Sequence, residues 1–468
     1  MDHRRAEGGD EPAAGVDLSA LLPGDVLAEV LRRAAPRDLA LLPRSVGGIL
    51  INFLGYFITE LFSRPPAAAG RPSVSGKRAF LPVAGSDSWA VVLDHCNGLL
   101  LVEADDDVLD HSPEFVLNPA TRWFAPLPSC PPLPSAMDAF GKKHLAYDPA
   151  ISPHYTVISI TYFGNNHRRG DPRSRDEHEL DPVMEQSEWP PSVYALHVFS
   201  SATGRWEERW LARQGEAACR VADLRRWIWN DRNNAAYWRG HLYVHCQSNF
   251  FMRISLADDK CQVIKAPAGI RATDEYSEIY LGKSEKGVYC AAISDEGRRR
   301  IRFWVLNESS CQMEWEFRHD SSLNEWMVKH RVNRSRDPRV HGPSWSLEDI
   351  NCYYSGCHEY EKMEAVIKEN FEWSLEASED EDSAYSSHSD EDSDGEGCPR
   401  YIDILGFHPY KEIVYLSQSI RRGLAYHLSS SRVQVLGNLY PARYDEELPN
   451  ERFITSSFPY MPSFLKQT

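Results

Sequence analysis

The feature that most limits the fold is a repeated unit of short apolar and aromatic runs, separated by Gly, Pro, Asn, Asp and Ser, that begins near residue 45. Such runs predict short antiparallel strands, and long helical periodicity is nearly absent. The units cover residues 91–127, 145–210, 236–264, 279–317 and 402–436. A spacing of roughly 40 to 65 residues is typical of four-stranded propeller blades. The sequence therefore predicts a mainly β chain with one large β-propeller-like domain of about six blades.

Tryptophan and tyrosine recur within these units, and we expect their rings to fill the wedges between neighbouring blades. The residues concerned are Trp123, Trp206, Trp238, Trp304 and Trp315. The most apolar run, residues 48–62, is too short to span a bilayer, and we expect a buried strand pair or a short core helix there.

Residues 21–40 read LLPGDVLAEVLRRAAPRDLA and predict one amphipathic helix that Pro36 ends. Such a short helix is marginal in water, so its apolar face must pack on the body of the protein or on a partner. The pattern resembles the first half of an F-box, the helical module that docks a ubiquitin-ligase substrate receptor onto the Skp-family adaptor. The resemblance implies adaptor contacts by Leu22, Pro23, Val26, Leu27, Val30 and Leu31.

The second half of an F-box, with its Trp-Arg pair on later helices, does not follow this helix. Leu39 to Leu42 lead directly into Pro43 and the apolar run, and the first tryptophan of the chain is Trp89. The chain is thus predicted to carry a truncated F-box-like helix over residues 18–42. The alternative is a helix that only caps the β domain.

The repeat units carry ordered sequence words of their own. Residues 94–101 read DHCNGLLL, residues 118–123 read NPATRW, and residues 145–149 read LAYDP. Asn97-Gly98 is a hairpin signal, and Asn118-Pro119 starts a turn. In this order the words resemble the F-box-associated β-propeller domains of plants, and the resemblance covers roughly residues 45–439.

Domain boundaries follow from composition. Residues 1–17 are predicted to be disordered, residues 43–445 to form the propeller domain, and residues 446–468 to form a C-terminal tail. Two insertions are expected within the domain: a charged loop at residues 165–191 and an acidic, disordered segment at residues 372–398.

The acidic insertion contains serines with an acid three residues downstream, a pattern that acid-directed kinases prefer. They are Ser378, Ser387, Ser389 and Ser393. Phosphorylation there would add negative charge and create a docking site for basic partners. A solvated loop without a regulatory role is the alternative.

Charge and cysteine content narrow the function further. The formal net charge is -17, of which residues 372–396 supply eleven acids, so no basic stripe for nucleic acid is expected. The ten cysteines are scattered, which is typical of buried reduced thiols. We expect no membrane segment and a location in the cytoplasm, the nucleus or both.

Catalytic motifs are not found: the sequence has no nucleophile elbow, phosphate loop, dinucleotide fingerprint or His-Glu-x-x-His. Cys352, Cys357 and His358, with Cys398 or His408, lack the second Cys pair of a zinc site. We therefore expect no enzyme, cofactor or metal. A propeller enzyme with paired carboxylates at the channel is the competing hypothesis.

The resemblance implies the substrate-recognition subunit of an SCF-type cullin-RING E3 ubiquitin ligase. The propeller would bind an unknown protein substrate, and the N-terminal helix would bind the Skp-family adaptor. The alternative is a protein-binding scaffold or decoy that is uncoupled from ubiquitination because its F-box is incomplete.

Overall fold

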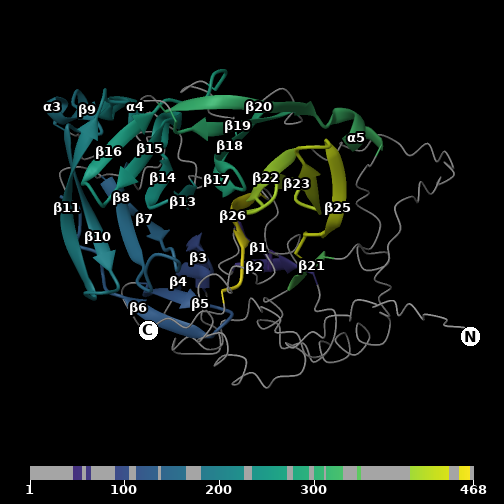
Figure 1. Cartoon of the computed structure of the whole chain (residues 1–468), viewed down its shortest axis with the longest axis horizontal. Coiled ribbons are helices and arrows are strands. Elements are labelled where there is room, and N and C mark those ends of the chain that lie inside the picture. Colours follow the sequence, from purple (N-terminus) through teal and green to yellow (C-terminus); the bar gives the residue numbers. More distant parts are fainter. Residues whose placement is uncertain are drawn as a thin grey trace, which may run out of the picture.

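The computed structural model describes residues 46–54, 59–64, 90–104, 112–134, 139–164, 181–225, 234–270, 278–294, 300–309, 313–329, 345–348, 401–441 and 453–463. Within these residues, the strands form six four-stranded antiparallel blades around one axis, with one strand of each blade at the centre (Figure 1). The protein is thus a β-propeller, as its repeats predict.

The first three blades follow the chain. Blade 1 consists of β3 (Ala90–Cys96), β4 (Leu99–Ala104), β5 (Glu114–Asn118) and β6 (Trp123–Leu127). Blade 2 consists of β7 (Ala139–Ala146), β8 (Thr156–Phe163), β10 (Val193–Ser200) and β11 (Arg205–Gln214). Blade 3 consists of β13 (Ala235–Trp238), β14 (His241–His245), β15 (Phe251–Ser255) and β16 (Lys260–Ile264).

The last three blades include one that is assembled from distant segments. Blade 4 consists of β17 (Glu278–Ser284), β18 (Gly287–Ser294), β19 (Arg300–Asn307) and β20 (Glu314–Ser322). Blade 5 consists of β22 (Ile402–Phe407), β23 (Ile413–Gln418), β24 (Arg422–His427) and β25 (Arg432–Asn438). Blade 6 consists of β26 (Ile454–Tyr460), β1 (Gly48–Phe53), β2 (Glu60–Ser63) and β21 (Trp345–Glu348).

Two pairs of blades are joined at their outer strands. β11 pairs in parallel with β16, and β25 pairs in parallel with β21, which produces two eight-stranded sheets. The inner strands β3, β7, β13, β17, β22 and β26 all run in one direction along the axis. We call the face where they begin the N-terminal face and the face where they end the C-terminal face.

The hydrophobic core is divided into six clusters, and each cluster is shared by two neighbouring blades. The cluster between blades 3 and 4 contains Trp304, which is 2% exposed, and Trp238 and Trp315 pack against it. Trp123 and Trp206 pack against the cluster between blades 1 and 2. The predicted wedge role of these tryptophans is confirmed.

Two of these tryptophans also tie neighbouring outer strands together. The indole N–H of Trp206 donates to the Pro128 carbonyl at 2.7 Å, just after β6 ends. The indole N–H of Trp315 donates to the Lys265 carbonyl at 2.9 Å, just after β16 ends. A partly buried ring with one polar tip suits such a junction, because the tip reaches a carbonyl that no strand partner uses.

The ring is closed by β26, which lies at the centre of blade 6 and pairs with β1. Gly48 lies opposite Tyr460, and Phe53 lies opposite Ile454. The prediction that residues 446–468 form a tail is therefore wrong for residues 454–460. The segment has no long apolar run to predict a strand, because only Phe458 and Tyr460 bury the side of β26 that faces blade 1.

The apolar run near the N-terminus is a strand pair, as expected, because it supplies β1 and β2. A buried polar network joins this pair to blade 1. Asn52 donates to the Val92 carbonyl at 2.8 Å and to the Ser456 hydroxyl at 2.7 Å. Thr59 donates to the Asn52 side chain and accepts the Val92 N–H at 2.8 Å.

The insertion predicted as a loop at residues 165–191 is partly ordered structure. Residues 165–180 lie outside the described part of the chain, but α3 (Pro182–Glu185) and β9 (Glu188–Trp189) follow, and β9 pairs with β12 (Cys219–Arg220). Asp181 caps α3 by accepting the Val183 N–H at 2.9 Å. The loop prediction fails here because Trp189 is buried, with its ring centre 4.8 Å from that of Phe163.

The described residues also include short helical turns and free cysteines. The remaining elements are α4 (Val221–Arg225), α5 (Asn324–Lys329) and the 3-10 turn η4 (Gln247–Asn249). Cys96, Cys246, Cys261 and Cys290 are buried free thiols, and Cys130 and Cys219 are free and partly buried. Over the same residues, none of the helices has the length and apolar character needed to cross a membrane.

Removing residues 454–468 should abolish cooperative unfolding, because β1 loses its inner partner and the wedges on both sides of blade 6 are opened. Removing only residues 464–468 is the matched control and should leave the thermal unfolding transition in place. Circular dichroism during heating measures both. Equal behaviour of the two truncations would show that β26 is a dispensable tail.

Candidate interaction surface

Carboxylates on the inner strands hold neighbouring blades together. Asp94 on β3 is 4% exposed and accepts the Leu145 N–H of β7 at 2.8 Å and its neighbour His95 N–H at 2.8 Å. Glu278 on β17 is 5% exposed and accepts the Ile404 N–H of β22 at 2.7 Å. An inner strand has one edge without a strand partner, so its buried N–H groups need such acceptors.

Side chains also cross the ring near the C-terminal face. The Lys283 ammonium of blade 4 donates to the Asn97 side-chain oxygen of blade 1 at 2.5 Å, and Asn97 donates to the Tyr147 carbonyl at 2.6 Å. Asn97 and Gly98 both have positive φ, at 46° and 92°, as the predicted tight hairpin turn requires. In a ring of six, blades 1 and 4 are opposite, so this contact spans the axis.

A second crossing lies deeper along the axis. The Tyr280 hydroxyl of blade 4 donates to the Ser457 carbonyl of blade 6 at 2.9 Å, passing blade 5. Gly406 of blade 5 makes room for it, since a Cβ at that position would lie 2.8 Å from the Tyr280 oxygen. These polar groups at the axis therefore hold the ring together.

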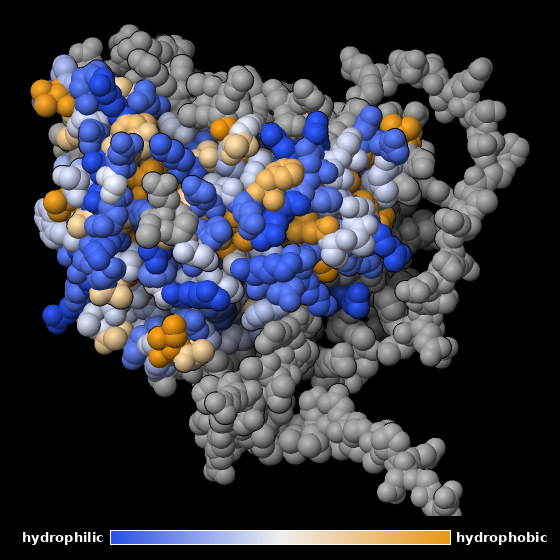
Figure 2. Space-filling view, turned by 45° about the horizontal axis from the view of Figure 1, so that its top comes forward, coloured by the Kyte–Doolittle hydropathy of each residue, from blue (hydrophilic) through white to orange (hydrophobic). Residues whose placement is uncertain are grey.

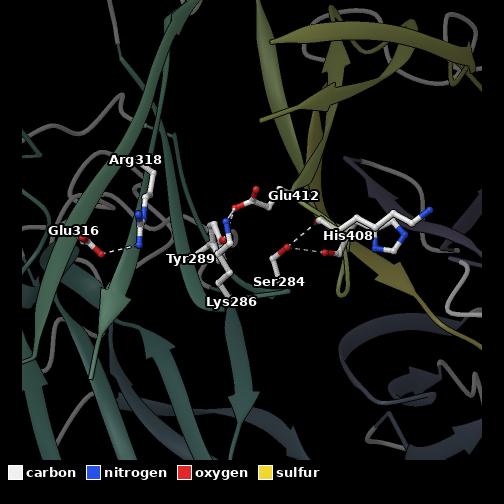
Figure 3. Close-up of polar contacts among 8 residues, drawn as sticks. Ser284, Lys286, Tyr289, Glu316, Arg318, His408 and Glu412 are labelled. Carbon is white, nitrogen blue, oxygen red and sulfur yellow. Dashed lines mark hydrogen bonds and ion pairs between the residues drawn. The ribbon is translucent and has the colours of Figure 1, made fainter. Parts of the chain in front are cut away.

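Charged groups gather on the C-terminal face where blades 4 and 5 meet (Figure 3). We call Lys286, Tyr289, Arg318, Tyr410 and Glu412 the blade 4–5 junction. The Glu412 carboxylate of blade 5 accepts from the Lys286 ammonium at 2.6 Å and from the Tyr289 hydroxyl at 3.2 Å, both on blade 4. The hydrogen bond from Lys286 holds the pKa of Glu412 below its usual value, and the charges of Lys286 and Arg318 act in the same direction.

Hydrogen bonds from Ser284 and to His408 fix the turn that carries Tyr410 and Glu412. The buried Ser284 hydroxyl points at the carbonyls of His408 and Lys411, at 2.9 and 2.8 Å (Figure 3). The His408 ring accepts the Tyr410 N–H on Nδ1 at 3.1 Å. Tyr410 is left 38% exposed on a preorganised turn, a favourable arrangement for a protein contact because little loop entropy remains to be lost.

The same turn brings a serine, a histidine and a carboxylate close together, but they do not form a catalytic triad. Ser284 donates to the His408 backbone carbonyl and to no ring nitrogen in the described structure, so the histidine cannot act as its general base. The buried thiols are also unreactive: burial raises the pKa of Cys96 to about 11, which keeps it protonated. The described residues include no cluster of three or more His, Cys, Asp or Glu able to hold a metal.

Large apolar side chains are exposed singly on the rim. Trp210 on β11 is 59% exposed, and Phe317 on β20 is 55% exposed. Figure 2 shows a mostly hydrophilic face on which apolar residues form separate spots. Scattered spots of this kind are usual on a monomer surface, so they mark a binding site only where the neighbouring backbone or charge supports one.

The residues singled out from the sequence are not brought together by the described structure. The predicted adaptor contacts, Leu22 to Leu31, and the predicted phosphorylation sites, Ser378 to Ser393, lie outside the described residues. Of the weighed zinc ligands only His408 is described, and its Nδ1 is occupied by the Tyr410 N–H.

Sequence reasoning missed the blade 4–5 junction. Lys286 and Glu412 are far apart in the chain, and each is an ordinary surface residue in its own turn. The only signal was the turn at Lys286-Gly287, where Gly287 has a φ of 145°. The turn that the Lys286-Gly287 turn faces is decided by the order of the blades in the ring.

Comparisons with known proteins leave the family open. No protein-family model matches this sequence, and no curated protein matches it either. Among solved structures, YCF48 bound to D1 peptide is similar at 9% identity and a TM-score of 0.32, over 84% of this chain and 82% of that one. Apo AztD from Citrobacter koseri is similar at 11% identity and a TM-score of 0.27, over 74% and 71%.

A third similar structure is prolyl oligopeptidase B from Galerina marginata, at 8% identity and a TM-score of 0.29. The match covers 88% of this chain but 41% of that enzyme. TM-scores this low carry no argument about function; strand order and pairing alone define the β-propeller fold.

Replacing Asp94 with alanine should lower the free energy of unfolding by about 2–4 kcal/mol, because two backbone N–H groups lose their acceptor inside the protein. Asp258→Ala is the control, since its side chain is 49% exposed and its partners, Lys260 and Ser255, lie at the turn between β15 and β16. Urea titration measures both variants. Equal, small losses would mean that Asp94 does not hold blades 1 and 2 together.

Acid should destabilise the protein through His408, whose side chain is buried and whose pKa burial lowers from 6.5 to about 4. Between these values the unfolded chain binds a proton that the folded chain does not, so stability falls as the pH falls. The expected slope from this group is at most about 1.4 kcal/mol per pH unit.

His408→Asn keeps an acceptor for the Tyr410 N–H and removes the titrating ring. Urea titrations between pH 6.5 and 4 should therefore give a shallower slope for this variant than for the natural protein. The slope is compared because the smaller side chain also changes stability at neutral pH. An unchanged slope would rule out His408 as a contributor.

Proposed function

We propose that this protein is a non-catalytic receptor that binds another protein through the surface of its propeller. We further propose that residues 18–42 connect it to a Skp-family adaptor, as in the substrate-recognition subunit of an SCF-type cullin-RING E3 ubiquitin ligase. The F-box-like residues Leu22 to Leu31 and the propeller that follows them support this role. Such ligases act in the cytoplasm and nucleus, where free thiols like Cys96 persist.

The best support for surface binding is that the polar groups near the axis are already engaged in hydrogen bonds between blades. Asp94 and Glu278 accept backbone N–H groups of the next blade, and Lys283 and Tyr280 reach across the ring. Groups committed in this way are poorly placed for chemistry on a substrate. The preorganised blade 4–5 junction, by contrast, presents Tyr410 and an ion pair to solvent.

The connection of the N-terminal segment is also consistent with a receptor. β1 begins on the C-terminal face, where the Gly47 N–H donates to the Tyr460 carbonyl at 2.9 Å. Residues 1–45 therefore join the propeller on the same face as the blade 4–5 junction. A target held at that junction would lie on the side of the ring from which the adaptor-binding segment departs.

A scaffold or decoy without ligase activity is the second candidate, and one observation favours it. The residues that follow the F-box-like helix, where the second half of an F-box would lie, are β1 and β2 of blade 6. They are buried between blades 5 and 1 and cannot also form helices against residues 18–42. The adaptor surface would then have to be made by the first helix alone.

A pull-down of the intact chain with the Skp-family adaptor distinguishes the two. Ligase coupling predicts retention of the adaptor, and Leu27→Glu with Val30→Glu should remove it because both lie on the apolar face of the helix. Glu29→Gln, on the polar face, is the matched control. Absence of adaptor binding by the intact chain, together with target binding that survives deletion of residues 1–42, would support the decoy and contradict the ligase role.

A further inference from the structure

Exposed prolines are concentrated in one segment, at the end of β6 of blade 1 and in the connection to β7 of blade 2. Residues 126–134 read PLPSCPPLP. All the prolines of this segment are exposed, namely Pro126, Pro128, Pro131, Pro132 and Pro134. Elsewhere in the described chain only Pro153 and Pro182 are exposed prolines, and each stands alone. The segment therefore differs from every other connection that the structure describes.

The backbone that follows β6 belongs to no regular element of the sheet. Residues 128–134 lie in no helix or strand, and none of them has a positive φ. Each proline ring fixes φ at about −65°. Cys130, Pro131 and Leu133 are also held in the extended region, because each of them precedes a proline. Together these constraints favour a polyproline II helix, which repeats every three residues.

Burial along the segment follows this period of three. Leu127, Cys130 and Leu133 are spaced three residues apart, and they are buried or half-buried. The residues between them, and Pro134 after them, are exposed. Leu127 belongs to the core between blades 1 and 2, and the Cys130 thiol is hydrogen-bonded to Ser159 of β8. One edge of the helix thus faces the propeller, and the other two edges face solvent.

The segment is also anchored before any partner arrives. The indole N–H of Trp206 donates to the Pro128 carbonyl at 2.7 Å, which fixes the start of the helix on blade 2. The prolines that follow have little conformational freedom to lose. A partner that binds residues 131–134 therefore meets a preformed helix, and the entropic cost of binding is low.

The two exposed edges determine which kind of aromatic-lined groove fits. An SH3-type groove takes each proline of a Pro-x-x-Pro pair together with the residue that precedes it. For Pro131 and Pro134 those preceding residues are Cys130 and Leu133, which lie on the edge that faces the propeller. A WW-type groove takes one pair of adjacent residues between its aromatic rings, and Pro131 and Pro132 lie next to each other on the two exposed edges.

We propose that Pro131 and Pro132 form a docking site for a WW-type domain of another protein. The two proline rings pack between the aromatic rings of that domain, while Leu127, Cys130 and Leu133 hold the helix on the propeller. The site lies between blades 1 and 2, which in a ring of six is opposite the blade 4–5 junction. It is therefore a second binding site, and it goes beyond the proposed function and does not involve the adaptor.

The test measures binding of the full chain to an immobilised WW domain that recognises Pro-Pro-Leu-Pro peptides. The natural chain should bind, and Pro131→Ala with Pro132→Ala should weaken binding by about tenfold, because the rings that fill the groove are removed. Pro153→Ala with Pro182→Ala is the matched control, since these exposed prolines lie in the connections of blade 2 and should not affect binding. Thermal unfolding checks that both variants are folded.

A free peptide of residues 126–134 provides the reference for accessibility. Binding of the peptide without binding of the chain would mean that the propeller covers the prolines, and it would overturn the proposal. Equal binding by the two variants, or failure of both the peptide and the chain to bind, would also overturn it. Retention of the chain by an immobilised SH3 domain would contradict the placement of Cys130 and Leu133 against the propeller. None of these outcomes depends on the adaptor pull-down, so the ligase role and this site can fail separately.

Discussion

Shared burial between neighbouring blades is the constraint on which the rest of this structure depends. Each four-stranded blade has two apolar faces, and neither can be covered within the blade itself. The six core clusters solve this by belonging to two blades each, so every blade needs both neighbours. A ring satisfies that need only if it closes, and closure depends on β26 pairing with β1 across almost the whole length of the chain.

Closure in turn explains the buried polar residues. The inner strands meet at the axis with one unpaired edge each, where water has little access, and their backbone groups need partners. Asp94, Glu278, Asn52 and Thr59 supply them from the neighbouring blade. A buried carboxylate that accepts a backbone N–H is stabilising, whereas the same carboxylate alone would be costly. These buried polar residues therefore have a structural role.

The surface is where the blades differ from one another. Outer strands pair across blades 2 and 3 over residues 212–214 and 260–262, and across blades 5 and 6 over residues 345–346 and 437–438. The turn holding Tyr410 is held by Ser284. The chain leaves the ring between blades 4 and 5 to supply β21 to blade 6. The first surface proposed for binding, the blade 4–5 junction, is made by residues of both blades.

The sequence by itself determined the strand content, the hairpin at Asn97-Gly98 and the wedge tryptophans, because these depend on neighbours within a few residues. It also carried the F-box-like pattern around Leu27, which the described residues do not include. Only the tertiary structure decided that residues 454–460 complete blade 6, that Trp189 orders its insertion, and that Lys286 meets Glu412. The physical reason is that these contacts join segments whose register is set by closure of the ring, and local sequence has no signal for a partner that distant.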